Sequence, residues 1–410
     1  MKVHQLTLKN FRGFTDETLD LDRPLTVLFG PNGSGKSSVL SALTLIFSAI
    51  FDNDPRMATI WVERVTEEDI RAGSSEFSTA AVVSNGAQQE DVRIHGRRGA
   101  LARPILSGRL FSLVGAAPFL PIFYGSSRAL AAAPDAFVAD DKTLAATPLA
   151  LRDALAVGQL KFRSLFTWFK EREDAENELK VSQSDLTLED PQLGAVRRAV
   201  AGMLPGFSGL RVQRDPLHMV IRKGATLLAI DQLSDGERLL LALAADLARR
   251  LAITHASGDP LLGEAVVLID EVELHLHPAW QRRVLGRLRA TFPNCQFIVT
   301  THSPQVLSEA PNDAVVLVKD FRFLHPGAPT AGRDSNAILA EAMDTPGRPE
   351  AQRNALQAVS ALLDAGLYAQ ARAALDALAQ AVTDRDRDVV GLRTMLHFLE
   401  GEDAADPQGA

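Results

Sequence analysis

The octapeptide GPNGSGKS at residues 30–37 constrains the fold of this chain more than any other segment. It follows an apolar strand predicted over residues 25–29 and precedes an apolar-periodic helix predicted from Lys36 to about residue 50. Glycines in such a loop let backbone N–H groups approach phosphate oxygens, while Lys36 reaches the β- and γ-phosphates and Ser37 offers a hydroxyl to Mg²⁺. The segment therefore predicts a phosphate-binding P-loop, rather than a merely flexible glycine loop, with nucleotide contacts from Gly30, Pro31, Asn32, Gly33, Ser34, Gly35, Lys36, Ser37 and Ser38.

A second motif, AVVLIDE at residues 265–271, ends an apolar strand with two adjacent carboxylates. Asp270 is predicted to bind Mg²⁺, and Glu271 to orient and deprotonate the attacking water as the catalytic base. Many buried strands end in acidic residues, so this motif indicates a nucleotide site only in combination with the P-loop. Together the two motifs predict ATP hydrolysis, with ATP and Mg²⁺ as cofactors.

A third motif, LSDGER at residues 233–238, stands at the start of a helix predicted over residues 235–254. The Ser234 hydroxyl, Gly236, Glu237 and the helix N-terminus form a potential anion site in addition to the P-loop. Two phosphate-binding devices are useful if each contacts a different face of one ATP. The alternative is an ordinary helix N-terminus in which Ser234 and Glu237 form a capping box.

The order of strand and helix patterns predicts an α/β fold with phosphate chemistry at the carboxyl ends of a sheet. Strands are expected at residues 3–8, 25–29, 265–269 and 296–300, with short strands between 75 and 124 and a hairpin at 209–230. A linker is expected at 131–148 and a helix from Pro278. Helices expected at 350–364, 367–381 and 388–399 indicate an antiparallel helical tail. The predicted domains are a head, residues 1–334, with a helical insertion at about 149–205, and a tail, residues 335–410.

Composition excludes several classes of protein. The 410 residues include one cysteine, which rules out a disulfide framework and a cysteine-based zinc site. The N-terminal segment lacks the apolar core of a signal peptide, and the longest mostly apolar run, residues 39–51, is too short to cross a bilayer. A cytoplasmic protein with no membrane partner is therefore expected. Of the net charge of −8, most belongs to the tail, which carries 12 acidic and 6 basic side chains.

The three motifs together resemble the ABC-type ATPase heads of the RecF, SMC and OLD group, over residues 1 to about 320. The resemblance implies that the signature serine, Ser234, contacts ATP held by the P-loop of a second subunit, so that ATP drives head dimerisation. The segment KNFRGF at residues 9–14 matches the N-terminal motif of the family, which implies a nucleotide contact for Arg12. The segment TTHS at residues 300–303 implies that His302 senses the γ-phosphate.

Two details of the resemblance leave alternatives open. ELHLHP at residues 273–278 falls where the family has its D-loop, although His275 and His277 have the alternative reading of metal ligands. The glutamine of the Q-loop is missing after the strand expected to end at Tyr124. Gln88 and Gln89 are placed in a polar turn, and Arg128 is a substitute that is equally compatible with a surface position.

A closer resemblance spans nearly the whole chain. FRSLFTWFKEREDAENE, IDEVELHLHPAWQRR, TTHSPQVLS and the segment DSNAILAEAM look like PtuA-type ATPases of Septu and related retron anti-phage systems. This resemblance implies a multimeric ATPase that holds an HNH nuclease partner and controls it through its nucleotide state. The tail is then a docking or oligomerisation surface, or simply a packing appendage.

Two other functions make different demands on the sequence. A RecF-like repair ATPase that clamps DNA needs a cationic groove, for which the candidate residues are Arg97, Arg98, Arg197, Arg198, Arg282, Arg283, Arg287 and Arg289. An OLD-type nuclease needs acidic residues at strand ends to bind metal. After His302 the run DRDRD offers Asp384, Asp386 and Asp388, but it lies between predicted helices with no apolar strand before it, so no nuclease activity is expected in this chain.

Overall fold

The structure is a computed structural model that describes residues 2–52, 64–86, 88–99, 120–126, 150–151, 153–155, 162–255, 258–341, 343 and 348–405. The linker expected at 131–148 and Arg128 lie outside these residues. The chain divides into two compact units, Met1–Ile338 and Leu339–Ala410.

A six-stranded sheet forms the centre of the first unit. Its strand order is β13 (Arg322–Leu324), β12 (Val315–Lys319), β3 (Leu25–Phe29), β11 (Gln296–Thr301), β10 (Val266–Ile269) and β6 (Pro121–Tyr124). All neighbours pair in parallel except β12 and β13. Strands β3, β10 and β11 are buried at every position, which explains their continuous apolar sequences. The predicted α/β class is confirmed, and the carboxyl ends of these strands meet at one edge.

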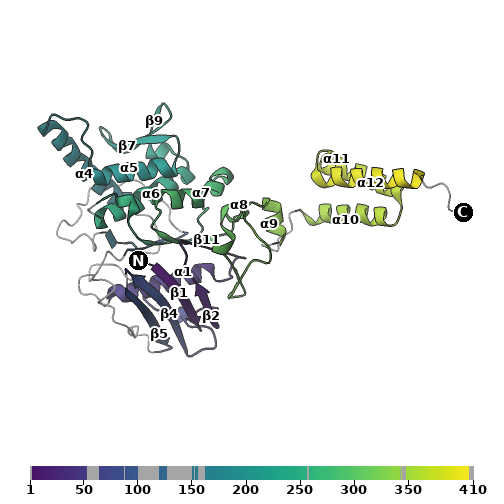
Figure 1. The fold of residues 1–410 in the computed structure, drawn as a ribbon, viewed down its shortest axis with the longest axis horizontal. Coiled ribbons are helices and arrows are strands. Elements are labelled where there is room, and N and C mark those ends of the chain that lie inside the picture. Colours follow the sequence, from purple (N-terminus) through teal and green to yellow (C-terminus); the bar gives the residue numbers. More distant parts are fainter. Residues whose placement is uncertain are drawn as a thin grey trace. The chain divides into compact units, whose positions relative to one another are not determined.

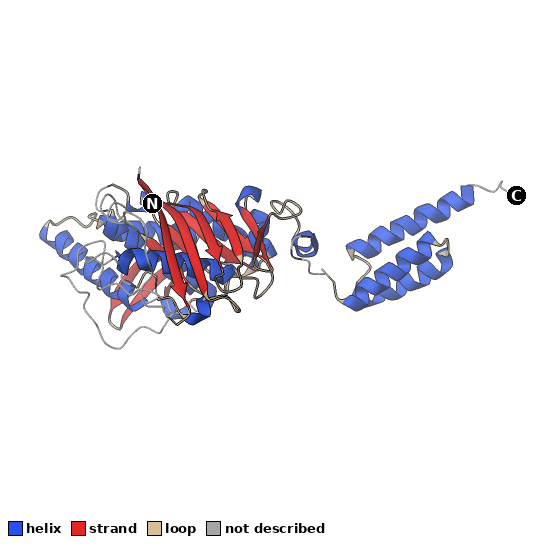
Figure 2. Ribbon diagram, turned by 90° about the horizontal axis from the view of Figure 1, so that it is seen from below, coloured by secondary structure: helices blue, strands red, loops and turns tan. Residues whose placement is uncertain are grey.

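A second, antiparallel sheet has the order β2 (Asp16–Asp20), β1 (Lys2–Lys9), β4 (Glu76–Asn85) and β5 (Gln88–Arg97). Figure 2 shows its strands side by side. Helix α1 (Lys36–Asp52) contacts strands of both sheets and is buried along nearly its whole length, because it lies between them. Strand β2 lies between the strands expected at 3–8 and 25–29, where no strand was predicted, and Gln88 and Gln89 begin β5 rather than lying in a turn.

Helices cover the other side of the six-stranded sheet (Figure 1). They are α4 (Phe162–Ser182), α5 (Pro191–Met203), α6 (Asp235–Thr254), α7 (Pro278–Thr291) and the short α8 (Pro304–Glu309). The expected hairpin at 209–230 is a three-stranded meander of β7 (Phe207–Arg214), β8 (Leu217–Lys223) and β9 (Thr226–Ala229). Single 3-10 turns are η2 (Glu67–Asp69), η3 (Ile230–Gln232), η4 (Pro260–Leu262) and η5 (Asn312–Ala314). Among the described residues no helix is long and apolar enough to cross a membrane.

A buried ionic cluster joins α6 to the end of β6. Asp246 accepts hydrogen bonds from Arg249 at 2.9 Å, from Arg250 at 2.7 Å and from the Tyr124 hydroxyl at 3.0 Å. The two arginines hold the pKa of Asp246 at about 2 despite its burial, which acts in the opposite direction. Because Tyr124 lies beside Ile269 in the sheet, this cluster fixes α6 next to the strand that leads into Asp270.

The second unit is helical. Helix α9 (Ser335–Glu341) spans the boundary, and α10 (Glu350–Asp364), α11 (Tyr368–Val382) and α12 (Arg387–Ala405) follow. Apolar side chains from all three later helices share one core: Val359, Leu363, Ala371, Leu375, Leu378, Ala379, Val389 and Leu396. The acidic run between α11 and α12 is occupied by ion pairs, since Asp386 and Asp388 bind Arg348, and Asp384 binds Arg393.

Candidate nucleotide-binding site

The P-loop leaves β3 at the edge where the parallel strands of the six-stranded sheet end. Gly30 has φ +149°, and a side chain there would overlap the carbonyl oxygen of Val318 on the neighbouring strand β12. Only glycine therefore lets β3 turn sharply into the loop. Helix α1 starts at Lys36, so its N-terminus points its free N–H groups and positive dipole end toward the loop.

Lys36 is folded back onto the loop that precedes it. Its Nζ donates to the carbonyl oxygens of Gly30 at 3.0 Å and Pro31 at 2.9 Å. Burial lowers the pKa of Lys36 to about 8, and the nearby carboxylates of Asp270, Glu271 and Glu273 only partly oppose this effect. The buried surroundings of Lys36 therefore destabilise its charged form. Negatively charged phosphate oxygens would stabilise the ammonium group more than the two neutral carbonyl oxygens do.

Residues from three segments meet at the expected metal position. The Ser37 hydroxyl lies 3.1 Å from both carboxylate oxygens of Asp270, and the Thr300 hydroxyl donates to Asp270 Oδ1 at 2.6 Å. Carboxylate and hydroxyl oxygens are the hard donors that suit Mg²⁺. The Thr300 oxygen also accepts the Glu271 backbone N–H at 2.7 Å. Thr300 therefore orients both acidic residues, a role that the sequence motif did not indicate.

Glu271 lies in the left-handed region, with φ +50°. A non-glycine residue in this region costs conformational energy, and such positions cluster at functional sites. Two hydrogen bonds to Thr300 fix the backbone at this position. The Glu271 N–H donates to Thr300 Oγ1, and the Val272 N–H donates to the Thr300 carbonyl oxygen at 3.0 Å. The strained turn places the Glu271 carboxylate at the site rather than in the continuing strand direction.

His302 follows β11 and lines the same site. Its backbone N–H donates to Glu273 Oε1, and burial raises the pKa of that glutamate. Burial, and then the positive charge of Lys36, lower the pKa of His302, which favours the neutral imidazole. A neutral ring has one donor and one acceptor nitrogen, so it can accept a proton or donate a hydrogen bond to phosphate.

These groups surround a cavity of about 600 Å³. Ten of the residues that line it are predicted site residues: Arg12, Asn32, Gly33, Gly35, Lys36, Ser37, Ser38, Asp270, Glu271 and His302. Gly30 and Pro31 contribute carbonyls to Lys36 without lining the cavity, and Ser34 is buried in the loop. Sequence reasoning missed Gly13, Thr300 and Phe321, of which Gly13 and Thr300 belong to the motifs KNFRGF and TTHS but were not singled out within them.

Arg12 reaches the rim of this cavity from the turn after β1. It has φ +49°, its Nε donates to Asp69 at 3.0 Å, and its guanidinium lies 5.3 Å from the centre of the Phe11 ring. The ion pair and the ring fix the side chain while one third of it stays exposed. This position is compatible with contact to a bound nucleotide.

The signature residues lie elsewhere. Ser234 is exposed at the N-terminus of α6, and Ser234 and Glu237 form the capping box that was the alternative interpretation. Glu237 also pairs with Lys223 at 2.7 Å. Gly236 packs so closely on the His275 carbonyl that a Cβ would come within 2.5 Å of its oxygen. The start of α6 is therefore coupled to the loop after Glu271, yet none of the three signature residues lines the P-loop cavity.

The two histidines of the loop have separate positions. His275 has φ +59°, and His277 caps α7 by accepting the Ala279 N–H at 3.3 Å. Among the described residues no three acidic, histidine or cysteine side chains are grouped as a metal site. At the expected Q-loop position, Tyr124 ends β6 and is followed by Gly125 and Ser126.

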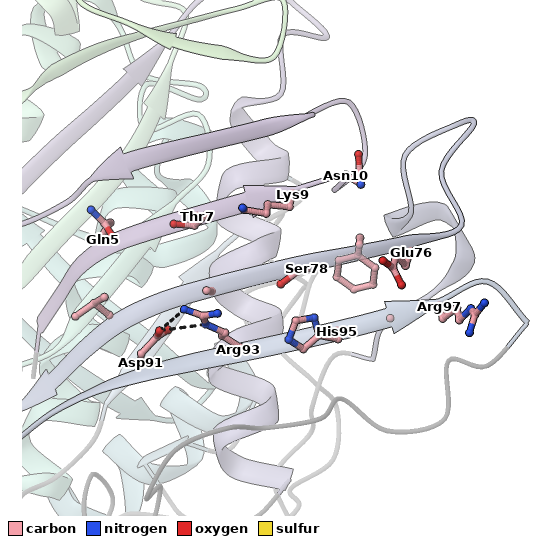
Figure 3. A pocket seen from close by; sticks show the side chains of 14 residues that line it. Gln5, Thr7, Lys9, Asn10, Glu76, Ser78, Asp91, Arg93, His95 and Arg97 are labelled. Atoms are coloured by element: carbon pink, nitrogen blue, oxygen red, sulfur yellow. Dashed lines mark hydrogen bonds and ion pairs between the residues drawn. The ribbon is translucent and has the colours of Figure 1, made fainter.

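A larger groove of about 780 Å³ lies on the open face of the antiparallel sheet (Figure 3). It is lined by side chains of three neighbouring strands, β1, β4 and β5, most of them polar or charged. The charges are mixed: Arg93 pairs with Asp91 at 2.8 Å, and Lys9 pairs with Asp16 at 3.3 Å. The groove is thus not a uniformly cationic channel for a polyanion.

Half of the predicted cationic candidates are held by other parts of the chain. Arg98 pairs with Glu67, Arg197 with Glu173, Glu176 and Glu189, and Arg198 with Asp259, while Arg287 donates to the Met203 carbonyl. Arg97 lines the groove, and Arg282, Arg283 and Arg289 are exposed on α7. Within the described residues, these candidates do not form one continuous cationic surface.

Comparison with known proteins places this site in a family. The family model described as "AAA domain, putative AbiEii toxin, Type IV TA system" matches residues 25–308, a span that includes the P-loop, Ser234, Asp270, Glu271 and His302. The chain is 41% identical over 182 residues to the retron Ec83 probable ATPase of Escherichia coli, covering 43% of this chain and 34% of that one.

Two further likenesses extend over more of the chain. It is 25% identical over 314 residues to Septu protein PtuA of Bacillus mycoides, covering 74% of this chain and 38% of that one. The matches thus span little more than a third of the length of these relatives. An SMC head domain from Thermotoga maritima aligns with a TM-score of 0.47 and 18% identity, over 80% of this chain and 100% of that one. The expected likeness to retron and Septu ATPases is confirmed.

Proposed function

The chain belongs to the AAA-domain family whose model it matches, and on this premise we propose that it binds ATP with Mg²⁺ and hydrolyses it between two copies of its head. The cavity around the P-loop takes the triphosphate. Lys36 exchanges its two carbonyl partners for phosphate oxygens, and the α1 N-terminus stabilises their negative charge. Arg12 contacts the nucleotide at the rim of the cavity.

Ser37 and Asp270 hold Mg²⁺, which neutralises charge on the transferring phosphoryl group. Glu271 takes a proton from the attacking water, and Thr300 keeps that carboxylate in place through the Glu271 backbone N–H. The neutral ring of His302 donates a hydrogen bond to the γ-phosphate. All five of these residues meet at the carboxyl edge of β3, β10 and β11.

One observation carries the proposal that two heads cooperate. Ser234 is exposed at the N-terminus of α6, outside the cavity that holds every other catalytic group. A helix N-terminus with a serine hydroxyl and a closely packed Gly236 is suited to phosphate. We therefore assign Ser234, Gly236 and Glu237 to the ATP bound by a second copy, with the capping box holding the helix start in shape until the heads pair.

Mixing two inactive variants tests this arrangement. Lys36→Ala removes the P-loop contact, and Ser234→Arg blocks the signature surface, so each pure variant should lose ATP hydrolysis. In a mixed pair, one of the two sites combines an intact P-loop with an intact signature helix. Mixing should therefore restore up to about half of the wild-type rate per pair, since one of two sites is intact.

The control is Ser182→Arg, which places the same side chain on an exposed serine of α4 and should leave hydrolysis unchanged. Absence of restored activity, with both variants folded and soluble, would mean that the signature residues do not act on the partner's nucleotide. Full activity of Ser234→Arg alone would have the same meaning.

The output of this cycle is proposed to be control of a separate effector in anti-phage defence, an HNH nuclease subunit. The similarity to retron and Septu proteins supports this proposal. The gene adjacent to this one should encode the effector. Cells that carry both genes should resist phage infection, and Lys36→Ala should abolish the resistance. Equal protection by either gene alone would contradict the proposal.

A further inference from the structure

The hairpin between β12 and β13 ends in a turn that is unusual for its residues. Lys319 pairs with Arg322, so the turn consists of Asp320 and Phe321, with φ of +52° and +57°. A two-residue turn of this kind normally uses Asn, Asp or Gly, because a positive φ is costly for a bulky side chain. Such a conformation persists only where the surrounding structure holds it, and it is typical of functional sites. The turn thus keeps an aromatic residue where glycine would be less strained.

The ring of Phe321 packs against two glycines from separate segments. A side chain at Gly13 would come within 2.2 Å of the ring atom Cε1, and one at Gly35 within 2.9 Å of Cδ1. Gly13 follows Arg12 in the turn after β1, whereas Gly35 belongs to the P-loop. Gly13 does not have a positive φ, so the space taken by the ring, rather than the backbone conformation, requires glycine there.

A cluster of aromatic rings holds Phe321 in place. Phe14 is fully buried, and its ring meets that of Phe321 edge-on with the ring centres 5.5 Å apart. Phe14 also stacks on Phe323 at 5.3 Å, and the backbone N–H of Phe323 donates to Glu17 on β2 at 3.2 Å. The hairpin is thus anchored to the antiparallel sheet, and the partly buried Phe321 lines the cavity around the P-loop.

We propose that Phe321 is a positioning residue for nucleotide binding. Its ring is a spacer that sets the distance between the turn bearing Arg12 and the P-loop, so that the guanidinium and the N–H groups of the loop reach the same nucleotide. Without the ring, both glycines lose their packing partner and the two segments are free to shift relative to each other. This role rests on the proposed function, because it requires ATP in the cavity.

The effect should fall on binding rather than on the chemical step. Glu271 and His302 are held by Thr300 and Glu273, through contacts that do not involve the hairpin. Phe321→Ala should therefore raise the KM for ATP by about ten- to a hundredfold, the cost of losing one hydrogen bond to a charged group, with kcat nearly unchanged. Steady-state hydrolysis by the full chain measures both constants. A large fall in kcat at an unchanged KM contradicts the proposed role.

A glycine variant separates the effect of the ring from that of the turn. Phe321→Gly deletes the same ring as Phe321→Ala, but it relieves the positive φ, so its thermal unfolding should occur at a higher Tm. If the ring positions the nucleotide contacts, both variants raise the KM to the same extent despite this difference in stability. A KM near the wild-type value in Phe321→Gly would mean that only the turn matters, and it would overturn the proposal.

The contact with Gly13 is tested by a pair of substitutions. Gly13→Ala pushes a methyl group into the ring and should raise the KM by itself. When it is combined with Phe321→Ala, the methyl group has room, so the KM should be no higher than in Phe321→Ala alone. Additive increases would mean that the two residues act independently and would contradict the spacer role.

Phe323→Ala is the matched control, because it removes a ring from the same hairpin at a position that does not line the cavity. Its KM should stay near the wild-type value, and an increase as large as that of Phe321→Ala would assign the effect to hairpin packing in general. In an Arg12→Ala background, Phe321→Ala should have a smaller effect, since the contact that the ring positions is already lost. An undiminished effect there overturns the proposal.

Failure of the proposed function gives a different result from failure of this role. A wild-type chain that neither binds nor hydrolyses ATP would contradict the proposed function itself. A wild-type chain that hydrolyses ATP, together with a Phe321→Ala variant of unchanged KM, would contradict only the positioning role of Phe321.

Discussion

The Ser37 hydroxyl lies 3.1 Å from both carboxylate oxygens of Asp270, across a sequence separation of 233 residues. The contact exists because β3 and β10 flank β11 in the sheet, so the loop after one strand faces the end of the other. It brings together the two side chains that Mg²⁺ would join.

Loss of this oxygen pair should weaken metal-dependent nucleotide binding. Asp270→Asn removes the anionic ligand and Ser37→Ala removes the hydroxyl, so both should reduce the preference for ATP with Mg²⁺ over ATP with EDTA. Titration calorimetry with and without Mg²⁺ measures that preference. Ser41→Ala, one turn further along α1 and not lining the cavity, is the matched control, and an undiminished Mg²⁺ effect in Asp270→Asn would remove that residue from the metal site.

ATP affinity should fall as pH rises above 8. The pKa of Lys36 is lowered to about 8 by burial, whereas contact with phosphate favours the charged ammonium and raises that pKa in the complex. Below pH 8 the ammonium is already present, so affinity is constant in this respect. Above pH 8 binding must take up a proton, and Kd should increase by up to about tenfold per pH unit.

Titrations between pH 7.5 and 9.5 check this dependence. Lys36→Arg supplies the matched control, because the guanidinium stays charged over the whole range and should flatten the pH slope even if affinity is lower overall. An identical slope in both proteins would assign the pH effect to another group.

Glu271→Gln should separate binding from hydrolysis. The amide cannot accept the proton of the attacking water, so the rate should fall by about 10²- to 10⁴-fold. The residue makes its structural contact through its backbone N–H to Thr300, which the substitution retains. ATP should therefore still bind and hold two heads together, and light scattering should show a doubled mass that appears only with ATP. A mass that ATP does not change would contradict head pairing.

The buried cluster around Asp246 should dominate the acid stability of the head. Since its pKa is about 2 in the folded chain and 3.8 in an unfolded one, its contribution is complete above pH 4 and is lost as pH falls toward 2. Asp246→Asn leaves Arg249 and Arg250 buried without their carboxylate and should destabilise the head by about 3–5 kcal/mol. Thermal unfolding measures the loss, with Asp313→Asn at an exposed carboxylate as the neutral control.

Local patterns in the sequence predicted many elements closely. The helix expected at 235–254 has those bounds, and the helix from Lys36 and the strand at 25–29 also agree. These elements depend on periodic apolar residues and capping signals that act within a few residues. The sequence missed β2 and counted two strands in the meander at 207–229, where there are three. Short polar strands have little local signal and form because a neighbouring strand pairs with them.

The candidate site was likewise predictable only in part from the sequence. The types and positions of Lys36, Ser37, Asp270, Glu271 and His302 are readable from motifs, because each motif is a short run beside one strand or helix. Two facts were not readable: that Thr300 bonds to Asp270 and Glu271, and that Arg197 is occupied by glutamates from α4 and the loop before α5.

By itself, the sequence predicted the α/β class with its P-loop motif and a helical tail, and it proposed which residues would bind phosphate and metal. Only the tertiary structure decided which side chains meet, that Ser234 lies outside the cavity of its own chain, and that the Phe321 ring packs against glycines of two separate motifs. The physical reason is that each motif reflects the local geometry of one short segment of backbone, whereas contacts between segments distant in the sequence depend on strand order and helix packing. Strand order and helix packing minimise the free energy of the whole chain, so no short segment encodes them.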